Sequence, residues 1–169
     1  MAGSLAPVGT VGSMIALEVL GIRLAAPEDS PVLLLQETSG TRCLPVWIGT
    51  VEAAAIAIVL DQQAEVTRPM THDLLASLVA LLAEDAEGQV VITDMQDGVY
   101  SAELRIGDTV VDCRPSDGVA LVLRLGWPVL CAPELMDRIG VELDAVPTDE
   151  VEQFRAFLDS VSAEDFESE

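Results

Sequence analysis

Residues 111–126, VDCRPSDGVALVLRLG, lead from an apolar strand into an apolar helix and repeat a pattern that occurs earlier in the chain. The earlier copy, IGTVEAAAIAIVL at residues 48–60, matches CRPSDGVALVLRL at residues 113–125. A hairpin with one helix cannot cover both of its apolar faces, so we expect two such units to pack together. The sequence therefore predicts an internal duplication. Four residue pairs correspond at one offset (117 − 52 = 65): Glu52 and Asp117, Ala55 and Ala120, Ile56 and Leu121, Leu60 and Leu125.

The alternation of apolar and polar residues outward from this stretch predicts an α+β fold. We expect strands at residues 15–24, 32–37, 41–48, 90–94, 100–106, 109–113 and 128–131. We expect helices at residues 50–60, 71–84, 117–125, 133–139 and 148–161, the first of them buried nearly all round. The predicted architecture is a mixed, mostly antiparallel sheet with buried helices, built from a duplicated hairpin–strand–helix unit, plus a C-terminal amphipathic helix.

The chain of 169 residues is half apolar, which suits one domain with a real core. We expect a flexible leader over residues 1–13 without signal-peptide character, a domain over 14–140, and an acidic helical extension over 141–169. No apolar stretch reaches the roughly 18 residues that span a bilayer. Cys43, Cys113 and Cys131 have no CxxC spacing, which predicts reduced thiols of a cytoplasmic protein.

The charge balance limits the possible partners. The chain has 29 acidic and 8 basic residues, every base is an arginine, and the net charge is −21. Such a chain repels nucleic acid and anionic membranes at long range. Any phosphate chemistry therefore needs a local arginine cluster or metal ions that carboxylates hold.

The opening stretch has a structural and a functional interpretation. Ser116 is the expected N-cap of the helix, and Asp117 suits the positive end of the helix dipole. Asp112 and Arg114 alternate with Cys113, so we expect them to share one face of the strand end. That pair is either a plain salt bridge, which we favour, or part of a reactive site.

The only histidine lies in RPMTHDLL, residues 68–75. Thr71 is the expected N-cap of the following helix and Asp73 a first-turn acid. We expect His72 to be partly exposed at the first helical position. An exposed imidazole near Arg68 and Asp73 suits general acid–base catalysis, but it is equally typical of a surface residue.

The duplication would bring carboxylates from both copies to one surface of helix starts. Their mutual repulsion would raise their pKa values unless a divalent cation neutralised them. Such a surface suits two-metal phosphodiester hydrolysis, with a nearby arginine binding a phosphate oxygen. The carboxylates are Glu52, Asp73, Asp112 and Asp117, and the arginine is Arg114 or Arg68.

Three motifs follow one another along the chain: LPVWIGTVEAAAIA at 44–57, RPMTHDLL at 68–75 and VDCRPSDGVALVLR at 111–124. Together they resemble the bifunctional nuclease domain family of bacteria and plants, over residues 14–139. The resemblance implies DNase and RNase activity, an α+β fold and homo-oligomers. Gly118 stands where the family usually has alanine, and we expect it to loosen the first helical turn.

The resemblance and the residue chemistry together predict a nuclease acting on RNA or DNA with Mg²⁺ or Mn²⁺, and no membrane partner. The alternative is a non-catalytic homo-oligomeric binding or regulatory module, in which the arginine–carboxylate network is structural. The predicted catalytic residues are His72, Asp73, Asp112 and Asp117. The predicted substrate-binding residues are Arg68, Arg114 and Ser116, and the predicted metal ligands are Glu52, Asp112 and Asp117.

Overall fold

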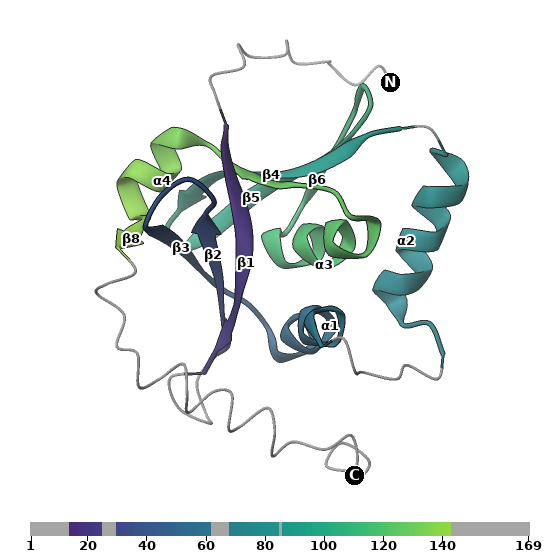
Figure 1. Cartoon of the computed structure of the whole chain (residues 1–169), viewed down its shortest axis with the longest axis horizontal. Helices are drawn as coiled ribbons and strands as arrows, with labels where there is room; N and C mark the ends of the chain where they lie inside the picture. Colours follow the sequence, from purple (N-terminus) through teal and green to yellow (C-terminus); the bar gives the residue numbers. More distant parts are fainter. Residues whose placement is uncertain (1–13, 25–29, 62–67, 85, 143–169) are drawn as a thin grey trace, which may run out of the picture.

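The computed structural model describes residues 14–24, 30–61, 68–84 and 86–142, so the predicted leader and C-terminal helix lie outside the described residues. The described ranges form the predicted α+β fold (Figure 1). The strands are β1 (Ile15–Arg23), β2 (Val32–Glu37), β3 (Arg42–Trp47), β4 (Gly88–Gln96), β5 (Val99–Ile106), β6 (Thr109–Cys113), β7 (Val129–Cys131) and β8 (Val141–Glu142). The helices are α1 (Thr50–Leu60), α2 (Thr71–Leu82), α3 (Pro115–Leu125) and α4 (Pro133–Ile139).

All of these strands belong to one sheet, in the order β6-β5-β4-β7-β1-β2-β3-β8. Each half of the sheet is an antiparallel meander followed by a helix: β1, β2 and β3 precede α1, and β4, β5 and β6 precede α3. Strand β7 lies between the halves, antiparallel to β1 and parallel to β4. Because β1 and β4 therefore run in opposite directions, the two units are related as a pseudo-twofold duplication predicts. The mixed, mostly antiparallel sheet is also confirmed.

The two repeated helices have the same length and the same bounds at the predicted offset. Thr50 corresponds to Pro115 and Leu60 to Leu125 (115 − 50 = 65; 125 − 60 = 65). Helix α3 nevertheless begins two residues before the predicted start, because proline fits the first helical position, where no N–H is needed. Arg114 is consequently the N-cap residue, and the prediction of Ser116 as N-cap was wrong.

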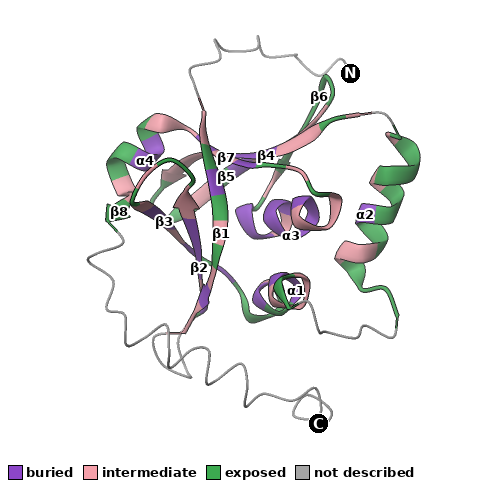
Figure 2. Ribbon diagram, in the orientation of Figure 1, coloured by how far each residue is buried: buried purple, intermediate pink, exposed green. Residues whose placement is uncertain are grey.

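The repeated helices pack against each other on one side of the sheet. Helix α3 contacts β4, β5, α1 and α2, which accounts for its run of buried residues from Val119 to Val122. The prediction that α1 is buried nearly all round was wrong. Only Ala53, Ala55 and Ile56 are buried there, whereas Val51 is 72% exposed, because only one face of α1 meets α3 and β1 (Figure 2).

Gly118 has a packing role instead of the loosening that we expected. A Cβ atom at this position would lie 2.5 Å from Cγ2 of Val90 on β4 and 3.1 Å from Sγ of Cys113. Both Gly118 and Val90 are buried. The missing side chain therefore lets the first turn of α3 approach the sheet closely.

The sheet also curls back on itself. The hydroxyl of Tyr100 at the start of β5 donates to the carbonyl oxygen of Pro45 on β3 at 2.5 Å, although four strands separate β5 from β3 in the sheet order. Burial raises the pKa of this tyrosine to about 12, so the hydroxyl stays protonated. The contact brings β3 close to the start of β5.

Candidate functional site

Arg114 links the two repeated helices at their N-terminal ends. Its Nη2 donates to Oε1 of Glu52 at 2.7 Å, and its Nε donates to Oδ2 of Asp117 at 2.7 Å. Nη2 also lies 3.1 Å from Oδ1 of Asp117, so that carboxylate is held by two nitrogens. Glu52 and Asp117 are each the third residue of their helix. The duplication thus gathers two carboxylates around one guanidinium, which the sequence predicted only as a general convergence of acids.

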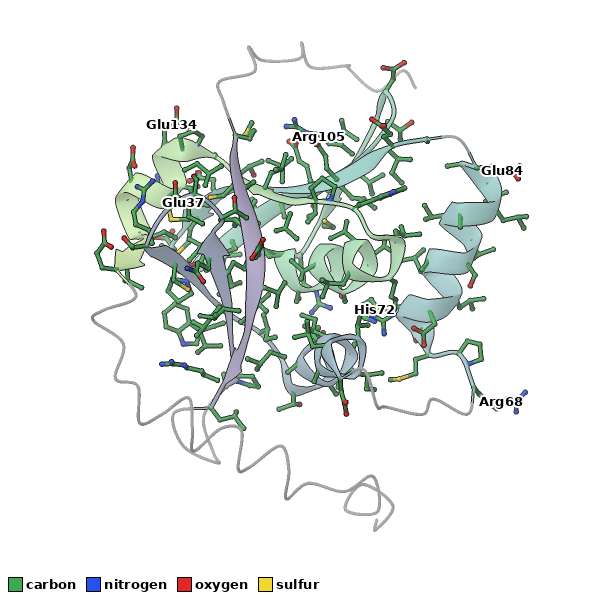
Figure 3. All side chains as sticks on the ribbon, viewed as in Figure 1. Glu37, Arg68, His72, Glu84, Arg105 and Glu134 are labelled. Carbon is green, nitrogen blue, oxygen red and sulfur yellow. The ribbon has the colours of Figure 1, made fainter. Side chains whose placement is uncertain are left out.

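His72 joins this group from a third helix. Its Nε2 lies 3.3 Å from Oδ1 of Asp117, and its side chain is 15% exposed, partly exposed as predicted. In Figure 3 the imidazole points from the first turn of α2 toward α1 and α3. A carboxylate only accepts hydrogen bonds, so Asp117 favours the ring form with hydrogen on Nε2. We call Glu52, His72, Arg114 and Asp117 the Arg114 cluster.

The electrostatics of the cluster keep Asp117 ionised. Burial raises the pKa of its carboxyl, but hydrogen bonds from Arg114 and His72 outweigh burial, and the pKa lies below its usual value. The same hydrogen bond from Arg114 to Asp117, followed by the one to Glu52, raises the pKa of the guanidinium. Glu52 is 15% exposed and Asp117 35%, whereas Arg114 is 66% exposed. Solvent and ligands therefore reach the guanidinium more easily than the acids behind it.

Asp73 is engaged elsewhere, as the anchor of the helix that carries His72. Its Oδ2 accepts a hydrogen bond from the backbone N–H of Met70 at 2.8 Å, and Met70, not Thr71 as predicted, is the N-cap residue. Its Oδ1 accepts from Nε of Arg124 on α3 at 2.5 Å. The hydrogen bond from Arg124 and that from Met70 hold the pKa of Asp73 below its usual value.

Sequence reasoning missed Arg124, whose side chain is only 7% exposed. Its Nη1 also donates to the carbonyl oxygen of Ala120 at 2.7 Å. The available signal was a single charge within the apolar run VALVLRL, since a buried charge needs an opposite charge. With Asp73, this arginine fixes α2 against α3 and so positions His72.

Asp112 lies apart from the Arg114 cluster. It is exposed on β6 opposite Glu103 of β5, and its side chain makes no hydrogen bond or ion pair with the described residues. The favoured salt bridge between Asp112 and Arg114 was therefore wrong for the described residues, because Arg114 pairs with Glu52 and Asp117 at the helix starts instead. Cys113 faces Gly118 of α3, so Asp112 points to the opposite side of the sheet.

Two other predicted substrate-binding residues, Arg68 and Ser116, lie outside the Arg114 cluster. Arg68 is exposed before α2 and lies away from His72 at the edge of the molecule (Figure 3). Ser116 is 5% exposed and packs within the first turn of α3, outside the Arg114 cluster. The cysteines are free thiols, as predicted, and burial raises the pKa of Cys113 to about 11, which leaves it protonated at neutral pH.

A hollow of about 450 Å³, the His72 hollow, opens beside the Arg114 cluster. All four cluster residues line it, and its remaining walls are mostly apolar. The apolar lining residues belong to α1 and to the start of α2: Val51, Ala55, Met70 and Leu75. A reacting group in this hollow would contact charged groups on one side and apolar side chains, several of them exposed to solvent, on the other.

The donor atoms do not fit the predicted Mg²⁺ or Mn²⁺ ion in this arrangement. A divalent cation needs several carboxylate oxygens facing one point, together with carbonyls or water. Arg114 instead occupies Oε1 of Glu52 and both oxygens of Asp117. Among the described residues, no group of three or more histidine, cysteine, aspartate or glutamate side chains is arranged to hold a metal ion.

Comparisons with known proteins agree with the motifs. A family model described as the bifunctional nuclease domain matches residues 33–144, more than half of the chain. Two Mycobacterium tuberculosis proteins, the uncharacterized proteins MT1877 (strain CDC 1551 / Oshkosh) and Rv1829 (strain ATCC 25618 / H37Rv), are 45% identical over 163 residues. These alignments cover 90% of this chain and 98% of each relative. The range that matches the family model contains the whole Arg114 cluster.

No helix in the described ranges is long and apolar enough to cross a membrane.

Proposed function

The chain belongs to the bifunctional nuclease domain family, and on this premise we propose that it hydrolyses phosphodiester bonds of RNA or DNA at the Arg114 cluster. One observation carries the proposal: a solvent-accessible guanidinium stands between two carboxylates, with an imidazole on one of them, at the wall of a hollow. In phosphodiester hydrolysis a guanidinium can bind the phosphate, an imidazole can transfer the proton, and a carboxylate can orient the imidazole.

Arg114 is the proposed phosphate-binding residue. Its Nε and Nη2 are used by the carboxylates, while no described residue accepts a hydrogen bond from Nη1. A phosphodiester oxygen can therefore bind at Nη1 without breaking the ion pairs. Glu52 and Asp117 hold the guanidinium in one orientation, so little reorganisation is needed when negative charge develops on the phosphate oxygens.

His72 is the proposed general base. Asp117 accepts from Nε2, which leaves the lone pair of Nδ1 available for a proton, and no described residue hydrogen-bonds to Nδ1. In the proposed step, Nδ1 takes a proton from the attacking water while the water oxygen bonds to phosphorus. The ester P–O bond then breaks, and the imidazolium returns the proton to the leaving oxygen.

The charge of the cluster limits binding of the substrate. Two carboxylates outnumber one guanidinium, so the cluster has one net negative charge while His72 is neutral. The whole chain adds long-range repulsion at a net charge of −21. A bound Mg²⁺ or Mn²⁺ ion would relieve this repulsion. That cleavage depends on such an ion stays a prediction, and binding of the ion requires Arg114 to release at least one carboxylate.

The direct test is cleavage of end-labelled single-stranded RNA and DNA by the purified chain and by His72→Gln, Asp117→Asn and Arg114→Ala. We expect each substitution to lower the cleavage rate by at least about 100-fold, the usual contribution of a general base or a charge-stabilising donor. Matched controls are Arg105→Ala, which removes an arginine paired with Glu103, and Asp108→Asn in the exposed β5–β6 turn. Wild-type rates in the His72 and Asp117 variants would contradict the assignment.

The same series separates the nuclease from the alternative, a non-catalytic module. A structural network predicts no cleavage by the wild-type chain and a lower melting temperature for Arg114→Ala. An active site predicts cleavage, with melting temperatures that stay the same or rise on substitution. A parallel reaction with EDTA tests whether cleavage depends on a divalent cation. Unchanged cleavage would remove Mg²⁺ and Mn²⁺ from the proposal, whereas loss of cleavage would show that a cation is required.

We also keep the homo-oligomer as a proposal, which the outer face of α2 supports. This face presents an apolar stripe to solvent, with Leu81 73% and Leu82 81% exposed. No charged residue occurs between Leu74 and Ala83. Two copies of a strongly acidic chain could meet along this stripe without bringing carboxylates together.

A further inference from the structure

A second hollow lies on the other side of Arg114, and the proposed function does not use it. It measures about 430 Å³, within the range of ordinary ligand pockets. Its walls include Trp47 at the end of β3, Val99 and Tyr100 at the start of β5, and Arg114 and Ser116 at the start of α3. We call it the Trp47 hollow. Arg114 lines both this hollow and the His72 hollow, so one residue forms part of the wall of each.

Trp47 is unusually placed for a large aromatic side chain. The preceding residue, Val46, is 1% exposed in the core, and strand alternation turns Trp47 to the opposite face, where it is 62% exposed. The described ranges contain three aromatic residues, and two of them, Trp47 and Tyr100, line this hollow. An exposed indole beside a cation is the usual platform for a flat aromatic ligand.

The charges of the Trp47 hollow favour an anion attached to such a ligand. Among the described residues that line it, Arg114 is the only charged one, and none is an aspartate or glutamate. That is notable in a chain with 29 acidic residues. A phosphate that approached Arg114 from this hollow would therefore meet no carboxylate among the described lining residues, whereas Glu52 and Asp117 line the His72 hollow.

We infer that the Trp47 hollow binds a nucleobase of a single-stranded nucleic acid, stacked on the indole of Trp47, while the phosphate next to that base lies on Arg114. This inference rests on the proposed function and names its substrate class. Bases in a duplex are stacked on each other and do not reach a side chain unless they are flipped out, so single strands are selected. Stacking also supplies binding that charge attraction cannot supply in so acidic a chain.

Tryptophan fluorescence gives a test that does not depend on cleavage. The chain has two tryptophans, and Trp127 packs against the core near Gly88. In a protein with the substitutions Trp127→Phe and His72→Gln, Trp47 is the only tryptophan, so selective excitation of tryptophan reports on Trp47 alone, and the oligonucleotide stays intact. We expect a single-stranded hexa-adenylate to quench this emission, and the same oligomer in a duplex, or without its bases, to leave it unchanged.

The matched variants are Trp47→Leu and Trp47→Phe on the His72→Gln background. Loss of one stacked base weakens binding by about 5- to 150-fold, so Trp47→Leu should bind the hexa-adenylate that much more weakly, and Trp47→Phe should retain most of the affinity. If Trp127→Phe does not fold, the emission of the His72→Gln protein minus that of its Trp47→Leu variant reports the same signal.

Two failures can be told apart. If the wild-type chain cleaves nucleic acid but Trp47→Leu leaves KM and affinity unchanged, the stacking site is wrong and the nuclease stands. If no cleavage occurs but the single strand quenches Trp47, the binding site stands and the nuclease fails. Equal quenching by single strand, duplex and the base-free oligomer would overturn the inference.

Discussion

Glu52 and Asp117 occupy the same position of two repeated helices and both accept a hydrogen bond from Nη2 of the same guanidinium, that of Arg114. Each carboxylate is the third residue of its helix, where the helix dipole favours an acid. Because α1 packs on α3 with the N-terminal ends close together, two ordinary helix-start acids become one binding site. The arginine between them comes from the N-cap position of α3, which corresponds to Gly49 in the first copy.

Gly49→Ala should disturb the site while leaving the fold intact. A Cβ atom there would clash with Oε2 of Glu52, so this carboxylate must rotate away. The φ of −77° suits alanine, so we expect a change in stability within about 0.5 kcal/mol. We expect cleavage to fall by about tenfold or more. The control is a double-mutant cycle with Glu52→Gln. If Gly49→Ala acts through Glu52, the double variant should lose little more cleavage rate than Glu52→Gln alone. Fully additive losses would contradict this coupling between the two residues.

Gly118→Ala should destabilise the protein, although alanine favours helices. The added methyl group would meet Val90, which is buried and stiff at χ1, and the start of α3 would have to move off the sheet. The free-energy cost of overpacking exceeds the free energy gained from the higher helix propensity of alanine. We therefore expect a loss of about 1–2 kcal/mol in the free energy of unfolding. Urea denaturation measures this change. Equal or greater stability than the wild type would mean that α3 approaches the sheet less closely than described.

Asp73→Asn should lower stability in a pH-dependent way. The pKa of Asp73 is depressed in the folded state by Arg124 and Met70, so its ionised form stabilises the fold. This contribution is complete above the unfolded pKa of about 3.9 and is lost as the pH falls through the lower, folded value. We expect a cost of about 2 kcal/mol near pH 7, because Arg124 keeps a buried charge without its partner.

The measurement for Asp73 is a set of thermal melts between about pH 3 and pH 7. The difference in melting temperature between the wild type and Asp73→Asn should become smaller toward acid pH. The melting temperature of Asp108→Asn should follow that of the wild type at every pH. A difference in melting temperature that stays constant with pH would mean that Asp73→Asn loses stability through packing and not through charge.

Arg114→Ala should create the metal site that the wild-type geometry blocks. The substitution frees Oε1 of Glu52 and both oxygens of Asp117, with His72 beside them. We therefore expect Mn²⁺ to raise the melting temperature of the variant and to leave the wild type nearly unchanged, since only a ligand that binds the folded state stabilises it. Equal stabilisation of both proteins would mean that Arg114 does not block the cation.

Leu81→Glu tests self-association along α2. The side chain is 73% exposed, so the substitution should change the folded monomer little. If copies meet through this stripe, two new carboxylates would face each other and the assembly should dissociate in analytical ultracentrifugation. Asp108→Asn is the surface control. The proposal fails if the Leu81 variant keeps the wild-type mass distribution, whether that is a monomer or an oligomer.

The amino-acid sequence alone determined the repeated architecture of this protein. Apolar periodicity and helix-start residues act within one or two turns, so the offset of 65, the matched helices and the acids at their starts could all be predicted. The ordered motifs likewise indicated the family. Exact cap positions were less predictable, since Arg114 and Met70 are not usual N-cap residues.

Only the tertiary structure decided which charged groups meet. Asp112 and Asp117 are five residues apart, yet the strand face directs one away from the helices and the helix start directs the other into the cluster. Asp73 pairs with Arg124, 51 residues away, and Trp47 lies beside Arg114 because the sheet curls. Local patterns determine which way a side chain leaves its own element, whereas its partner depends on how distant elements pack, and no short stretch of sequence contains that information.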